Sequence, residues 1–134
     1  MKTLVENHMT PKERLVIVTQ LTPVRGVLKQ MRQHRVRSVI VEKSHPNGAY
    51  GLVTFKNILQ SIVAEDGDID LLNAYDIMNA PAIAVSRKLG IQYAARMMVR
   101  NSIKRLLVID DNELHGILTM SDILDVLMDE VENH

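Results

Sequence analysis

The chain has 134 residues, of which 46% are hydrophobic, and its 16 Lys and Arg residues are balanced by 16 Asp and Glu residues. This length fits one compact domain or two small halves that share a core, and the apolar content excludes a disordered chain. A net charge of zero argues against nucleic-acid binding as the main role. The chain has no Cys, which excludes disulfides, thiolate catalysis and Cys-ligated zinc.

The sequence shows no targeting or membrane signal. The N-terminal residues lack the apolar segment of a signal peptide. No apolar run approaches the roughly 20 residues that are needed to span a bilayer. We therefore expect a cytoplasmic protein that does not associate with a membrane.

The first predicted elements are a buried strand and an amphipathic helix. Residues 15–18 form a short apolar run that is typical of a strand. Thr22-Pro23 is a helix start signal, and we expect Pro23 at the first helical position. Apolar residues then recur with the spacing of one helix face, at Val24, Val27, Leu28 and Met31.

Two strands and a second helix are predicted next. The strands comprise residues 36–41 and the residues that lead to Thr54, and a turn over residues 43–48 joins them. An acidic loop over residues 64–70 and a short helical segment over residues 71–79 follow. Between Thr54 and this loop, a helix is predicted with an apolar face made by Phe55, Ile58, Leu59 and Ile62.

The second half of the chain repeats this order of elements. An apolar run over residues 82–85 lies 67 residues after the first strand, and a strand is predicted over residues 103–109. The turn over residues 110–113 is two residues shorter than its counterpart, so the offset then falls to 65 residues. Three sets of residues match the first half: Ile91, Ala94, Ala95 and Met98; Gly116-Ile117-Leu118-Thr119 after Gly51-Leu52-Val53-Thr54; and Met120, Ile123, Leu124 and Leu127.

Each half therefore consists of strand–helix–strand–strand–helix, and with roughly 60 residues it is too small to bury its own apolar faces well. We predict an α/β (α+β) fold in which two repeats, related by a pseudo-twofold axis, pack as one module. The expected boundaries are 9–64 for repeat one, 65–75 for a linker and 76–130 for repeat two. Four methionines are expected to fill the core: Met97, Met98, Met120 and Met128.

The order, spacing and duplication of these elements resemble a tandem pair of CBS domains, also called a Bateman module. The resemblance covers about residues 9–130. It rests on Asp76-Ile77-Met78, on the strand from Ile103 to Asp110, and on the segment from Gly116 to Ile123.

The resemblance implies a regulatory module that binds an adenosine-containing ligand in clefts between the two repeats. AMP, ADP, ATP, S-adenosylmethionine, NAD-type ligands and cyclic dinucleotides are the ligands of the family. There, the Thr/Ser-x-x-Asp motif contacts phosphate and ribose, the first strand of the other repeat meets the adenine, and basic residues that begin the second strand reach the phosphates.

Two ligand-binding sites follow from the resemblance, residue by residue. The first is the better supported and would combine Thr119, Asp122, Arg14, Leu15, Val16, Lys104 and Arg105. The second would combine Thr54, Asn57, Pro81, Ala82, Ile83 and Arg37. Because Asn57 stands where the family usually has Asp, we rank the second site below the first.

The residue types fit these implied roles. A carboxylate such as that of Asp122 can accept hydrogen bonds from both adjacent ribose hydroxyls, and bonds to an ionised acceptor are roughly twice as strong as neutral ones. Asn57 offers one carbonyl oxygen and an NH₂ group, so it could satisfy only part of that pair. Lys104 and Arg105 would hold phosphates, Lys as a point charge and Arg as a fork.

A second reading of the same residues remains open. Thr followed three residues later by Asp or Asn, before an apolar helix, is equally typical of a capping box, in which the side chains only satisfy helix-end donors. A Thr side chain can cap a helix and still face a ligand. Lys104 and Arg105 could likewise be solvated residues at a strand end.

No metal or catalytic site is expected. Residues 66–70 resemble the opening of a calcium loop, but Leu71 and Ile77 occupy the positions that require Gly and Glu. The five histidines show no metal-ligand spacing. Nothing supplies a nucleophile with a general base, so we do not expect an enzyme.

The predicted function is a sensor of adenine nucleotides, such as an energy sensor that responds to AMP or ATP and signals to an unknown partner protein. The resemblance also implies a homodimer that forms through the helices of the repeats. The alternative is a ligand-free CBS module that serves dimerisation or acts as a scaffold.

Overall fold

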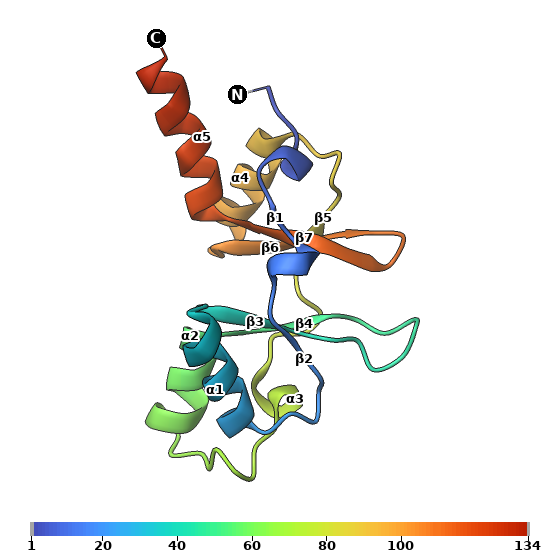
Figure 1. Ribbon diagram of the computed structural model, residues 1–134, viewed down its shortest axis with the longest axis vertical. Helices are drawn as coiled ribbons and strands as arrows, with labels where there is room; N and C mark the ends of the chain where they lie inside the picture. Colours follow the sequence, from blue (N-terminus) through green and yellow to red (C-terminus); the bar gives the residue numbers. More distant parts are fainter. Residues whose placement is uncertain (1, 134) are drawn as a thin grey trace. The chain divides into compact units, whose positions relative to one another are not determined.

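A computed structural model describes residues 2–133 and divides the chain into two compact units (Figure 1). One unit is Val16–Ala82, and the other joins the residues up to Leu15 with those from Ile83 onwards. Both units are mixed α/β, and each contains the predicted order strand–helix–strand–strand–helix. The predicted fold class is therefore confirmed.

The unit formed by Val16–Ala82 contains a three-stranded sheet in the order β2-β3-β4. β2 (Ile17–Val18) is parallel to β3 (Ser38–Val41), and β3 is antiparallel to β4 (Gly51–Thr54). Its core includes the predicted helix face, with Val24, Val27 and Met31 buried against the strands. The helical elements are α1 (Val24–His34), α2 (Phe55–Ile58), the π-helix η3 (Leu59–Ala64) and α3 (Ala74–Ile77).

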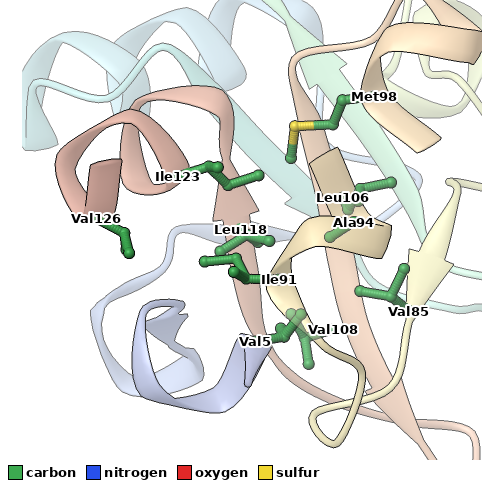
Figure 2. Close-up of a cluster of buried hydrophobic side chains, with 10 residues drawn as sticks. All are labelled: Val5, Val85, Ile91, Ala94, Met98, Leu106, Val108, Leu118, Ile123 and Val126. Carbon is green, nitrogen blue, oxygen red and sulfur yellow. The ribbon is translucent and has the colours of Figure 1, made fainter. Parts of the chain in front are cut away.

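The other unit contains a four-stranded sheet in the order β1-β7-β6-β5. Its strands are β1 (Thr10–Pro11), β5 (Ala84–Val85), β6 (Arg105–Asp110) and β7 (Glu113–Thr119). Its helices are η1 (Val5–Asn7), η2 (Lys12–Arg14), α4 (Ile91–Asn101) and α5 (Met120–Glu132). Ile91, Ala94 and Met98 of α4 meet Leu118 of β7 and Ile123 of α5 in the aliphatic core shown in Figure 2.

The first helix of each repeat ends in the same way. Arg35 after α1 and Ser102 after α4 both adopt the left-handed conformation, with φ of 54° and 53°. The next residue, Val36 or Ile103, then donates its N–H to the carbonyl of Met31 or Met98. These bonds satisfy carbonyls that the helix end leaves unpaired. The predicted strands therefore begin two residues late, because their first residues serve the helix end.

The start of α1 corrects one prediction. Pro23 is not the first helical residue but the N-cap, with an extended ψ of 150°. The first two helical N–H groups donate to the linker, from Val24 to the Leu72 carbonyl and from Arg25 to the Ile69 carbonyl. The linker therefore supplies the acceptors that a helix start lacks, and it fixes the helix one residue later than expected.

The most informative unpredicted feature is a pair of matched leading segments. In one unit, Val5 N–H donates to the Leu89 carbonyl, and in the other unit Ala74 N–H donates to the Thr22 carbonyl. Both segments then run along the third strand of a repeat, where Thr10 pairs with Ile117 and Asn79 bridges Leu52. The segment before repeat one thus completes the unit of repeat two, whereas the linker completes the unit of repeat one.

The leading segments explain the glycine that opens the duplicated motif. A Cβ on Gly116 would lie 2.4 Å from the Thr10 carbonyl oxygen and 3.0 Å from the Met9 sulfur. A Cβ on Gly51 would lie 2.5 Å from the Met78 sulfur. Both glycines are therefore required for close approach of the leading segment to the strand.

Asp110 ties the end of β6 to the loop before α4. Its Oδ2 accepts hydrogen bonds from the backbone N–H of Arg87 at 3.1 Å and from the Arg87 Nε at 2.8 Å. Hydrogen bonds from the Ser86 side chain and the Arg87 backbone lower the pKa of Asp110 from 3.8 to about 2. The ionised carboxylate therefore stabilises the folded state.

Replacing Asp110 with Asn is expected to destabilise the protein at neutral pH by roughly 1–2 kcal/mol, the range for losing charge-assisted bonds. Because the folded pKa is depressed, the contribution of Asp110 is complete above pH 4 and is lost as the pH falls towards 2. Urea unfolding of both proteins between pH 6 and pH 2.5 should show the difference shrinking as the pH falls. A difference that stays constant with pH would contradict the role of the ionised carboxylate.

Candidate functional site

The candidate site lies where the third strand of each repeat becomes a helix. β7 ends at Thr119, which is the N-cap of α5, and β4 ends at Thr54, which is the N-cap of α2. Thr119, Asp122, Thr54 and Asn57 are all half-buried. Both threonines have extended backbone, which the strand imposes and which an N-cap requires.

In repeat two, Thr119 and Asp122 form a capping box. Asp122 Oδ2 accepts from the Thr119 backbone N–H at 2.8 Å, and the Asp122 N–H donates to Thr119 Oγ1 at 3.2 Å. The capping interpretation of this motif is therefore realised in the structure. It uses only one carboxylate oxygen, since none of the residues from 2 to 133 donates to Oδ1. The Thr119 hydroxyl hydrogen is likewise left available as a donor.

In repeat one, the same positions use their hydrogen bonds differently. Asn57 Oδ1 accepts from the Thr54 backbone N–H at 2.8 Å and also from the Thr54 hydroxyl at 3.0 Å. Because a backbone N–H can only donate, the atom that it meets must be the Asn57 oxygen. The Asn57 carbonyl is thus occupied twice, and the group left for a ligand is its NH₂.

The basic residues lie beside these strand ends. Arg105 is opposite Thr119 in the β6–β7 ladder, and the Lys104 carbonyl accepts from the Met120 N–H at 2.9 Å. In repeat one, Arg37 directly precedes Ser38, which is opposite Thr54. Lys104 and Arg37 are exposed, as solvated residues at a strand end would be, whereas Arg105 is half-buried.

The segments expected to meet the adenine are divided between the units. Arg14 and Leu15 belong to the unit of Thr119 and Asp122, where η2 follows β1. Val16 belongs to the other unit. Conversely, Pro81 and Ala82 belong to the unit of Thr54 and Asn57, where the Ala82 N–H donates to the Tyr50 carbonyl, whereas Ile83 belongs to the first unit.

The acidic linker engages a neighbouring cation. Asp70 forms a two-pronged ion pair with Arg25, at 2.6 Å to Nε and 2.9 Å to Nη2, and this bond lowers the pKa of Asp70. Among residues 2–133, no group of three or more His, Asp and Glu side chains could hold a metal ion. His134 lies outside the described residues.

An exposed apolar stripe on α5 was not predicted. Met120 and Met128, which we expected in the core, are 37% and 57% exposed. Their positions share one helix face with Leu124, Leu127 and Val131, and a groove along this face is lined by Leu124, Leu127, Met128, Val131 and Glu132. The sequence signal was an apolar face on this helix that is wider than a core of this size covers, because Ile123 and Val126 alone are buried in α5.

Repeat one carries a matching stripe. Phe55, Leu59 and Val63 are 49%, 59% and 70% exposed and correspond to Met120, Leu124 and Met128 at the offset of 65 residues. The expectation for the methionines therefore holds for Met98, which is 1% exposed, and is wrong for Met120 and Met128. No helix within residues 2–133 has the length and apolarity to cross a membrane.

Comparison with protein families gives a match to the CBS domain over residues 5–64 and again over residues 74–129. Among curated proteins, an uncharacterized protein of Methanopyrus kandleri is 37% identical over 100 residues, covering 72% of this chain and 50% of that protein. An uncharacterized protein of Methanocaldococcus jannaschii is 40% identical over 65 residues, covering 44% of this chain and 39% of that protein. The chain spans half or less of the length of these curated relatives.

Solved structures show the same fold. A hexameric CBS-CP12 protein from bloom-forming cyanobacteria is 32% identical with a TM-score of 0.83, covering 91% of this chain and 69% of that one. An uncharacterized conserved protein from Pyrococcus horikoshii is 24% identical with a TM-score of 0.83, covering 95% and 93%. CBSX2 in complex with AMP is 23% identical with a TM-score of 0.77, covering 94% and 96%.

Proposed function

The chain belongs to the CBS domain family, and we propose that it is a regulatory module that binds an adenine nucleotide and signals to a partner protein. The observation that supports this most directly is the second oxygen of Asp122. The cap uses Oδ2, so Oδ1 remains an ionised acceptor beside the Thr119 hydroxyl. A structural neighbour that was solved with AMP makes a nucleotide the first ligand to test.

The proposed contacts follow the chemistry of the side chains. Asp122 accepts from the ribose hydroxyls, and the Thr119 hydroxyl donates to the ligand. The N-terminus of α5 favours a phosphate, as does the charge of Lys104 and Arg105. Arg14, Leu15 and Val16 supply the backbone that meets the adenine. The weaker site comprises Thr54, Asn57, Pro81, Ala82, Ile83 and Arg37.

Replacing Asp122 with Ala is expected to weaken AMP binding by about 1.5–3 kcal/mol, the range for a hydrogen bond to a charged group. Calorimetry on the full chain measures this loss directly. Since Asp122 also caps α5, Asp122→Asn is the matched control for folding: its amide oxygen can still accept from the Thr119 N–H. Affinity that is unchanged in both variants would refute the ribose contact.

We propose that the module is a homodimer whose interface includes the stripe on α5. The stripe gathers five apolar side chains on one helix face, and repeat one presents its counterpart with Phe55, Leu59 and Val63. Exposed apolar patches of this kind mark association surfaces. A second copy is the partner that supplies the same apolar chemistry from both repeats, and such symmetric pairs are the commonest assemblies.

The alternative is a dimerisation module without a ligand. A ligand that binds only the folded state must raise the thermal midpoint. If AMP, ADP, ATP and S-adenosylmethionine all leave the midpoint unchanged at millimolar concentration, the scaffold function is favoured over the sensor.

A further inference from the structure

The two repeats offer opposite hydrogen-bonding groups at the same position. In repeat two, the groups left for a ligand are the Asp122 Oδ1, an acceptor, and the Thr119 hydroxyl hydrogen, a donor. In repeat one, Asn57 has only its NH₂ left, a donor, and the Thr54 hydroxyl hydrogen is already used by Asn57 Oδ1. The side chain at this position therefore accepts in one repeat and donates in the other.

The charges at matched positions change in the same direction. Repeat one carries Arg37 and Lys56 around its strand ends, with no acidic residue in the first turn of α2. Repeat two carries Lys104 and Arg105 together with Asp122 and Asp125. These four charges cancel, whereas repeat one has two positive charges and none to oppose them. An anionic group is thus favoured by both charge and hydrogen bonding in repeat one.

We infer that repeat two takes a ribose with free hydroxyls, whereas repeat one rejects that diol and takes a ribose whose hydroxyl carries a phosphate. This inference rests on the proposed function, because it assumes that both strand ends face a nucleotide. A diol needs an acceptor, and Asn57 has none left. Phosphate oxygens accept hydrogen bonds and carry negative charge, so they suit the Asn57 NH₂ and the Lys56 ammonium.

The test uses two probes that differ only in the phosphate: AMP and adenosine 3′,5′-bisphosphate. Calorimetry on the full-length chain is expected to give one AMP per chain for the wild type. Asn57→Asp should bring the number of AMP molecules per chain to two and weaken bisphosphate binding at least tenfold. Asp122→Asn should weaken AMP at least tenfold and leave bisphosphate affinity within twofold.

Both substitutions conserve shape and the acceptor that caps the helix. An Asp at position 57 can accept from the Thr54 N–H as Asp122 does from Thr119, so folding should be retained, and thermal unfolding checks this. Lys56→Ser, which copies Ser121, gives a third arm: it should weaken the bisphosphate and not AMP.

The outcomes separate the two proposals. AMP that does not bind the wild type, or binding that Asp122→Asn leaves unchanged, overturns the proposed function. Two AMP molecules per wild-type chain, or bisphosphate affinity that Asn57→Asp leaves within twofold, overturns the present inference alone.

Discussion

Replacing Gly116 with Ala is expected to destabilise the protein by roughly 1–3 kcal/mol, the usual penalty for forcing atoms into a packed site. The new Cβ would lie 2.4 Å from the Thr10 carbonyl oxygen, which is backbone and cannot rotate away. Relief requires β1 to move off β7, where Thr10 pairs with Ile117. Urea unfolding of wild type and variant measures the loss.

Gly51→Ala is the matched control, because it is the same substitution at the equivalent position of repeat one. Its Cβ would meet the Met78 sulfur at 2.5 Å, whereas the nearest backbone atom, the Asn79 oxygen, is 3.4 Å away. A Met side chain is flexible and can take another rotamer, so we expect less than half of the loss seen at Gly116. Equal losses at both glycines would show that the contact with the Thr10 backbone does not limit the approach.

The order of elements could be predicted because apolar spacing survives in both repeats. Val24, Val27 and Met31 match Ile91, Ala94 and Met98, and all six residues are buried. The helix starts after Thr54 and Thr119 were visible as capping boxes, which are local signals between residues three apart. Packing follows such patterns closely, since an apolar face at helical spacing has one stable position against a sheet.

The leading segments could not be predicted, because nothing local connects Val5 to Leu89 or Thr10 to Ile117. Their pairing depends on long-range backbone bonds, to which side-chain periodicity gives no clue. The match between Met9 and Met78 was present in the sequence, but the segments lie 69 residues apart rather than 67. The difference reflects two more residues between the leading segment and the first strand in repeat one, where η2 lies.

The hydrogen bonds of Asn57 were also beyond the sequence. Pattern alone placed Asn57 as a weaker version of Asp122 that could satisfy part of a diol. The structure shows that its carbonyl accepts twice from Thr54, so the difference from Asp122 is one of sign rather than strength. Side-chain amides can turn either end towards a partner, and only the position of the Thr54 N–H decides between them.

Replacing Leu127 with Asp is expected to convert the proposed homodimer into a monomer. Leu127 is 45% exposed at the centre of the stripe on α5 and lines its groove, so its burial in a dimer would place a carboxylate in an apolar interface. An uncompensated buried charge typically costs 3–5 kcal/mol, which weakens dimerisation by roughly two to four orders of magnitude. Sedimentation equilibrium of both proteins at micromolar concentration measures the change in mass.

Asp129→Asn is the matched control on the same helix, because Asp129 is exposed but lies outside the stripe and its groove. It should leave the dimer intact. The Leu127→Asp monomer should keep its thermal transition, since Leu127 is not among the core residues of α5, which are Ile123 and Val126. It should also keep its AMP site, because Thr119 and Asp122 depend on β7 and on the first turn of the helix. A wild-type chain that sediments as a monomer, or a Leu127→Asp variant that remains dimeric, would place the association surface elsewhere.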